Sequence, residues 1–215
     1  MNRLIKYLAA AYGVVAIASA SHAQWTVTSL HPAGLPQSHA FAVSGGQQAG
    51  FIDIRGGFHA ALWTGAAASL VDLNPAGATQ SNESAIDAGQ QVGTARVGGV
   101  FRASLWSGTA ASWVSLHPAG ATESGANAIS DGLQAGSARV GGITRASLWS
   151  GTAASWVDLH PEGSTRSDIR ALGGGQQVGV VDGRASLWSA TAASWVDLST
   201  FLPAGFNDTR AEDIS

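Results

Sequence analysis

Hydrophobic residues along the chain fall into short runs that are separated by glycine-containing turns. In the stretch 83–116 the four runs are Glu83–Asp87, Gln90–Val97, Val100–Trp106 and Ala111–Leu116. Gly-Gly and Ala-Gly or Ser-Gly pairs lie between them and supply the positive φ that tight hairpin turns need. A proline, which cannot donate to a β-ladder, follows the last run at Pro118. The pattern therefore predicts four short β-strands joined by hairpins.

This four-run unit recurs along the chain with a period of 43 residues. Three series keep the period without interruption: Gly50, Gly93, Gly136 and Gly179; Pro32, Pro75, Pro118 and Pro161; Ser38, Ser81, Ser124 and Ser167. A fourth series, Trp63, Trp106, Trp149 and Trp188, steps by 43, 43 and then 39 residues because the last unit has a shorter turn. Such regularity predicts a repeat architecture.

Four strands with short connections fill a unit of this length, which is typical of a β-propeller blade. A β-solenoid is the alternative, although its coils are usually shorter and less hairpin-like. The predicted fold is therefore all-β, a propeller-like array of about four four-stranded blades. The units lie near residues 38–80, 81–123, 124–166 and 167–205 of a repeat domain that spans 24–215.

Both ends of the array carry partial units. The segment from Trp25 to Pro32 resembles a fourth strand, and the segment from Thr209 to Ser215 resembles a first strand. Neither is accompanied by the rest of a unit, so we expect an incomplete or open array rather than a closed ring. A longer parent protein or a truncated reading frame is the simplest explanation.

Residues 1–23 have the features of a secretory signal peptide. Arg3 and Lys6 precede an apolar stretch, and the small residues Ser21 and Ala23 favour cleavage before Gln24. The apolar stretch is shorter than the roughly 20 residues that span a bilayer. We expect a secreted or periplasmic bacterial protein with no integral membrane segment after cleavage.

The composition excludes several classes of partner and site. The net charge is −3, and it becomes about −5 once Arg3 and Lys6 are removed with the signal. An acidic surface repels nucleic acid and anionic lipid, so neither is an expected partner. The chain has no cysteine, which excludes disulfides and thiolate metal sites. Its stability must come from a continuous core.

The unit resembles the HAF family of probable extracellular repeats. The matching motifs are Ser84-Ala85-Ile86, Gly89-Gln90-Gln91-Val92-Gly93 and Phe58-His59-Ala60-Ala61-Leu62-Trp63, followed by Asp72-Leu73, Asp158-Leu159 and Asp197-Leu198. Later copies keep Leu-Trp but replace the His with Arg102, Arg145 and Arg184, and Ser115-Leu116 departs from Asp-Leu. The resemblance covers nearly all of the mature chain. It implies an exported bacterial protein of β-repeats and carries over no biochemical activity.

Seven tryptophans occupy two positions of the repeat. We call the residues at one repeat position a column. The first column is Trp63, Trp106, Trp149 and Trp188, and the second is Leu70, Trp113, Trp156 and Trp195. They could form platforms that stack sugars, but leucine packs without offering a flat face. We therefore predict that they form the core between blades.

The polar columns also favour structural roles. They comprise His31, Asn74, His117 and His160; Asp72, Ser115, Asp158 and Asp197; and Arg102, Arg145 and Arg184. The histidines suggest a metal site, but equivalent positions converge only near a propeller axis, so we expect turn histidines. Equivalent aspartates share one environment, whereas acid and base catalysts need different ones. We expect the arginines to pair with acids on neighbouring strands.

No nucleophile elbow, zinc-protease, P-loop or dinucleotide motif occurs in the sequence. We predict no catalytic, metal or cofactor-binding residues. The function predicted is a non-catalytic extracellular scaffold or binding module, whose partner is an unidentified protein or glycan at the cell exterior. A carbohydrate-binding propeller is the alternative. A propeller glycoside hydrolase or lyase is the third hypothesis, and it requires two acids from different columns at one channel mouth.

Overall fold

The computed structural model describes residues 26–203, 205–206 and 208–214, and the predicted signal peptide lies outside them. The described chain contains four antiparallel four-stranded sheets, each with its strands in sequence order. The first sheet comprises β1 (Ser38–Ser44), β2 (Gln47–Ile54), β3 (Gly57–Trp63) and β4 (Val71–Asp72). The second comprises β5 (Ala78–Asp87), β6 (Gln90–Val97), β7 (Val100–Trp106) and β8 (Val114–Ser115). No helix in these residues is long and apolar enough to cross a membrane.

The third and fourth sheets repeat the same plan. The third comprises β9 (Ala121–Ser130), β10 (Leu133–Val140), β11 (Ile143–Trp149) and β12 (Val157–Asp158). The fourth comprises β13 (Ser167–Gly173), β14 (Gln176–Val181), β15 (Arg184–Trp188) and β16 (Val196–Asp197). The bounds of β6 and β7 agree with the sequence prediction. The predicted fold class, an all-β array of four blades, is thus confirmed.

The fourth run of each unit is less strand-like than we expected. A three-residue 3-10 helix precedes a two-residue strand in every sheet: η1 (Ala67–Ser69), η2 (Ala110–Ser112), η3 (Ala153–Ser155) and η4 (Ala192–Ser194). The serine hydroxyl at the end of each 3-10 turn reaches back, and Ser112 Oγ donates to Thr109 O at 2.6 Å. This local bonding competes with ladder pairing. A further 3-10 helix, η5 (Leu198–Phe201), follows β16.

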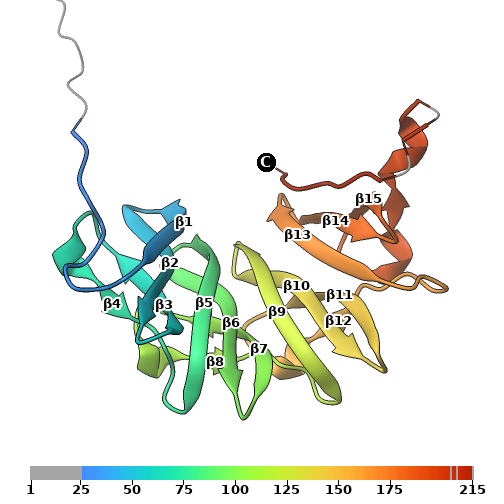
Figure 1. Cartoon of the computed structure of the whole chain (residues 1–215). Helices are drawn as coiled ribbons and strands as arrows, with labels where there is room; N and C mark the ends of the chain where they lie inside the picture. Colours follow the sequence, from blue (N-terminus) through green and yellow to red (C-terminus); the bar gives the residue numbers. More distant parts are fainter. Residues whose placement is uncertain (1–25, 204, 207, 215) are drawn as a thin grey trace, which may run out of the picture.

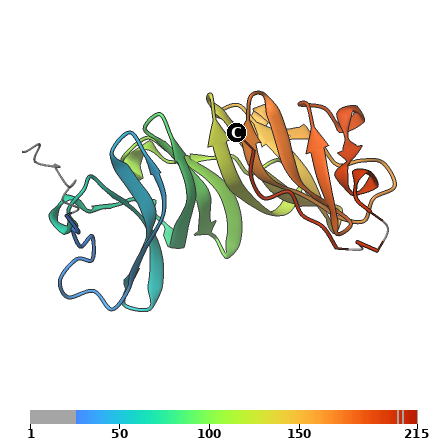
Figure 2. The ribbon, with the colours of Figure 1, turned by 90° about the horizontal axis from the view of Figure 1, so that it is seen from above.

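The four sheets follow one another along an open arc (Figure 1). Seen from above, they lie face to face in sequence order (Figure 2). In the described residues no strand of the first sheet pairs with the fourth. One hydrogen bond marks each junction: the N–H groups of Ala60, Ala103 and Ala146 donate to the hydroxyls of Ser81, Ser124 and Ser167 in the next sheet, at 3.0, 2.8 and 2.7 Å. The serine column therefore joins each sheet to the next.

Apolar side chains fill the junctions between the sheets. Between the first and second sheets, Ala60, Leu62 and Leu73 pack against Ile86 and Trp106. The first tryptophan column is at most 1 % exposed, which confirms its predicted place in the core. The second column is half-buried, and the indoles of Trp113, Trp156 and Trp195 donate to the hydroxyls of Ser104, Ser147 and Ser186.

The two end segments differ from the prediction and from each other. Residues 26–32 form no strand, although Leu30 packs against the first sheet near Trp63. Residues 208–214 also have no assigned strand, but they lie along the fourth sheet. There Thr209 Oγ1 accepts from Ala185 N at 2.9 Å, which is the bond that the serine column makes at the other junctions. This segment thus occupies the place of a first strand.

Candidate functional site

A glutamine that recurs in each unit fixes two turns at once. The buried amide of Gln134 donates to Gly132 O and accepts from Gly151 N, both at 2.7 Å. Gln48, Gln91 and Gln177 make the same pair of bonds in their own sheets. Two satisfied bonds at a buried amide rigidify a turn, so this column is part of the scaffold. The sequence showed the glutamines as a repeat marker but not the role of their side chains.

The histidine column connects the end of one sheet to the start of the next. His117 Nε2 lies 3.0 Å from Ala121 O, and Nδ1 lies 2.8 Å from Ser124 Oγ. A carbonyl only accepts, so Nε2 carries the proton and Nδ1 accepts from the serine. Burial lowers the pKa of His117 and favours this neutral form. His160 makes the equivalent bonds, and His31 makes the one to Ser38.

The aspartates of the next column are held by neighbouring basic side chains. Arg145 Nη1 lies 2.8 Å from Asp158 Oδ2, and Arg184 Nη1 lies 3.0 Å from Asp197 Oδ2. In the first sheet His59 replaces the arginine and lies 2.8 Å from Asp72. The predicted pairing is thus confirmed for Arg145 and Arg184.

The second sheet is the exception, because Ser115 replaces the aspartate there. Among the described residues no acidic side chain forms an ion pair with Arg102. The expectation that Arg102 pairs with an acid is therefore wrong.

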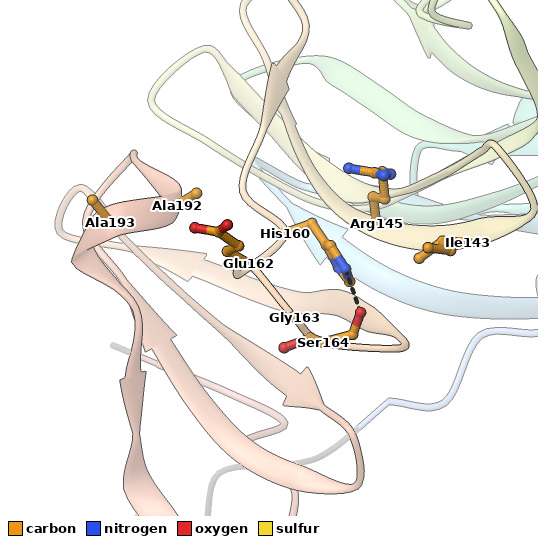
Figure 3. Close-up of a pocket in the computed structure, with 8 residues that line it drawn as sticks. All are labelled: Ile143, Arg145, His160, Glu162, Gly163, Ser164, Ala192 and Ala193. Atoms are coloured by element: carbon orange, nitrogen blue, oxygen red, sulfur yellow. Dashed lines mark hydrogen bonds between the residues drawn. The ribbon is translucent and has the colours of Figure 1, made fainter.

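A hollow of about 670 Å³ lies between the third and fourth sheets. Figure 3 shows Arg145 and His160 on one side of it and the 3-10 turn with Ala192 and Ala193 on the other. His160 uses both ring nitrogens on Ser164 and Ser167, and Arg145 is bound to Asp158. These side chains already have partners within the scaffold, which leaves them few groups to offer a ligand.

Three smaller hollows recur at equivalent places of the repeat. The first is lined by Phe58, Gln80, Ser81, Asn82, Thr94 and Phe101, and the second by Phe101, Glu123, Ser124, Gly125, Ser137, Arg139 and Thr144. Six residues of the second follow six of the first at the 43-residue spacing. The third continues the series at Arg166, Asp168, Val180 and Asp182. We call them the aromatic, mixed and ionic grooves, and together the variable face.

The variable face differs from the scaffold because its columns change chemistry from sheet to sheet. The column that begins at His39 continues as Asn82, Gly125 and Asp168. A second column is formed by the bulged residues of the first strands, Phe41, Ser84, Asn127 and Arg170. A β-bulge turns its side chain away from the regular alternation. Strand periodicity alone therefore does not show which face these residues join.

The first sheet gives the variable face an aromatic end. The rings of His39 and Phe51 are stacked with centroids 4.9 Å apart, and those of Phe51 and Phe58 are 4.7 Å apart. Phe41 joins the cluster and is 58 % exposed. These are accessible aromatic side chains, unlike the buried tryptophans on which sugar stacking could have been expected.

The fourth sheet gives the variable face an ionic end. Asp168 is buried, and desolvation raises its pKa against the opposing charges of Arg170 and Arg166. Burial acts to raise the pKa of Asp182 as well, but hydrogen bonds from Thr165 and Arg166 outweigh it and the pKa is lowered. The pKa values of the two carboxyl groups in this groove are thus shifted in opposite directions.

Glu83 is a second departure from the repeat. It is 1 % exposed, and neither carboxyl oxygen has a hydrogen-bond partner among the described residues. Burial raises its pKa to about 9, although the Gly50 backbone N–H acts in the opposite direction. The other sheets have Ala40, Ala126 and Ile169 at this position. In the described chain no three His, Asp or Glu side chains gather where they could hold a metal ion.

The comparisons with known proteins support the fold. No family model matches the chain, and no curated protein matches it. Among solved structures it is similar to TolB from Acinetobacter baumannii, with a TM-score of 0.50 and 12 % sequence identity. The match covers 75 % of this chain but 42 % of TolB, so the chain spans less than half of that protein. At this identity the likeness concerns the architecture alone: the four sheets are blades of a β-propeller fold.

Proposed function

We propose that the chain is an exported, non-catalytic β-repeat module that binds its ligand through the variable face. One observation carries the proposal: residues that recur in register form the scaffold, whereas most residues that line the grooves, Ser81 and Ser124 apart, change from copy to copy. Packing requires the same residue type in each copy, but a ligand needs a different group at each contact. The motif resemblance to HAF extracellular repeats and the signal-like segment 1–23 support export.

A titration followed by amide NMR tests the binding role. The mature chain, 24–215, would be titrated with D-glucose, D-glucuronate, L-glutamate and phosphate as separate probes. We expect shifts at groove positions such as Thr94, Ser137 and Val180, and none at scaffold positions such as Gln134. Each probe would be added to about 10 mM, which detects even weak specific binding. Shifts confined to scaffold residues, or no shifts with any probe, would overturn the proposal.

Export has its own test. Expression of the full chain in a bacterial host, followed by N-terminal sequencing of the protein outside the cytoplasm, should give a first residue of Gln24. Retention of Met1 in the cytoplasmic fraction would contradict the export half of the proposal.

The carbohydrate-binding alternative now depends on phenylalanine rather than tryptophan. Phe58 and Phe101 line the aromatic groove and are 43 % and 37 % exposed. Apolar sugar faces stack on such rings. Glucose-induced shifts that disappear in a Phe58→Ser variant would favour this alternative over an unspecific scaffold.

A second candidate function is a hydrolase or lyase, and the ionic groove is what favours it. Asp168 and Asp182 come from different columns, line one groove and have pKa values shifted in opposite directions. Unlike carboxyl groups are the pattern of acid–base division of labour. The check is an activity assay with chromogenic glycosides, which a hydrolase cleaves, and with uronate oligomers, which a lyase cleaves to an unsaturated product. Any turnover found should be lost in Asp168→Asn. Equal rates in the variant would remove this candidate.

A further inference from the structure

The ionic groove has a lining that is unlike the other two. Three arginines and three aspartates surround a hollow of about 310 Å³: Arg166, Arg170, Arg210, Asp168, Asp182 and Asp208. The C-terminal segment forms one wall, because Thr209 N donates to Gly183 O at 2.9 Å. The formal charges of the six side chains cancel, so the net charge of the groove does not by itself select a ligand.

The aspartates already have partners inside the protein. Asp182 Oδ1 accepts from Thr165 N, Thr165 Oγ1 and Arg166 N at 3.0, 2.6 and 2.9 Å. Asp168 Oδ1 accepts from Asn127 Nδ2 of the neighbouring sheet at 3.1 Å. Asp182 therefore holds the loop before β13, and Asp168 joins two blades while its second oxygen lies 3.5 Å from Arg170 Nε.

The arginines are less well satisfied. Arg170 Nε lies 3.5 Å from Asp168 Oδ2, but it is buried and makes no aligned hydrogen bond among the described residues. Arg166 forms no ion pair in the described part of the chain. Arg210 is 3.7 Å from Asp208, and both side chains are more than half exposed. Guanidinium groups present parallel N–H donors that match a carboxylate.

From this imbalance, and resting on the proposed function, we infer that the ionic groove binds a small carboxylate that also carries hydroxyl or ammonium donors. The carboxylate takes donors of Arg166 and Arg170, and the donor group of the ligand bonds to Asp168 Oδ2 in place of its 3.5 Å contact with Arg170. A phosphate dianion carries one hydroxyl donor but two negative charges, so the three aspartates disfavour it relative to a carboxylate with a single charge. The hollow is at the lower end of the range for small-molecule sites, which suits one sugar acid or amino acid.

Isothermal titration of the mature chain at low salt tests this inference with two matched pairs of probes. D-glucuronate is paired with D-glucose, which has the same ring without the carboxylate. L-glutamate is paired with L-glutamine, and inorganic phosphate is the third arm. We expect one of two results. Either glucuronate binds, or glutamate and glutamine both bind, because the two amino acids share the α-carboxylate and its ammonium group. Glucose and phosphate should bind at least about tenfold more weakly.

Two variants locate the site. Arg170→Gln should weaken the binding about tenfold or more, because a charge-assisted bond is lost. Arg184→Gln, on the same sheet but paired with Asp197 outside the groove, should bind as the parent does. Equal affinity in Arg170→Gln, or preference for phosphate over every carboxylate, would overturn the inference. Binding of glucose at the aromatic groove alone would overturn it too, yet would leave the proposed function intact.

Discussion

Removing the carboxyl group of Glu83 should stabilise the protein at neutral pH and not at acid pH. In the folded chain the carboxyl has a pKa of about 9, raised from 4.5 by burial. In the unfolded chain the carboxyl has a pKa near 4.5. Between pH 4.5 and pH 9 the unfolded state therefore releases its proton, whereas the folded state keeps it. Folding stability is therefore lost as the pH rises from about 4.5 towards 9.

The size of the effect follows from the same shift. Each pH unit above the unfolded pKa corresponds to about 1.4 kcal/mol, so by pH 7 the buried carboxyl lowers the free energy of unfolding by about 3 kcal/mol. Glu83→Ala removes this penalty and installs the residue found at the equivalent Ala126. It also removes one buried methylene group, which costs about 0.8 kcal/mol at every pH. We expect a slightly less stable variant at pH 4.5 and a more stable one at pH 7.

Urea unfolding of the mature chain at pH 4.5 and pH 7 measures the difference. The stability of Glu83→Ala relative to the parent should rise by about 3 kcal/mol between the two pH values. Glu123→Ala, an exposed glutamate on the first strand of the third sheet, is the control and should show no such rise. Parallel stability of Glu83→Ala and parent at both pH values would refute the reasoning.

Three scaffold variants test the columns by the same urea assay. Ser115→Asp gives Arg102 the partner that its equivalents have and should raise the stability by less than about 1 kcal/mol, and a loss would contradict the pairing rule. Gln134→Ala removes the buried amide that bonds two turns and should lower the free energy of unfolding by about 2 kcal/mol. Gly136→Ala places a methyl group against the Gly125 carbonyl and should cost about 3 kcal/mol or more, whereas an unchanged stability would show that β9 and β10 can separate freely.

The strands and turns could be predicted from the sequence because glycine and proline mark them. Gly98 and Gly99 both have positive φ in the turn between β6 and β7, as the Gly-Gly pair indicated. The fourth strand of each unit is shorter than predicted. Its residues alternate like those of a strand, but the serine that ends each 3-10 turn bonds locally instead.

The grooves could not be predicted from the recurring residues, because most of the residues that line them change from one copy of the repeat to the next. The columns of tryptophan, histidine and aspartate were conspicuous and proved structural. Glu83 could have been found by asking which column contains a single charged member among apolar residues. The ionic groove required more, because Arg170 is a bulge residue and Arg210 comes from a segment without an assigned strand. Neither position follows from period-two alternation.

The central claim is that residues outside the repeat carry the binding while the repeated ones carry the fold. It is tested most directly by a thermal shift measurement on a chain in which Arg166, Asp168 and Arg170 are replaced by their third-sheet equivalents, R166E, D168G and R170N. The melting temperature without ligand should stay within a few degrees of the parent, because only Asp168 of the three bonds another blade, and one such hydrogen bond is worth about 1 kcal/mol. The rise in melting temperature that a bound carboxylate gives the parent should disappear. Unfolding of the variant, or an undiminished rise, would contradict the account.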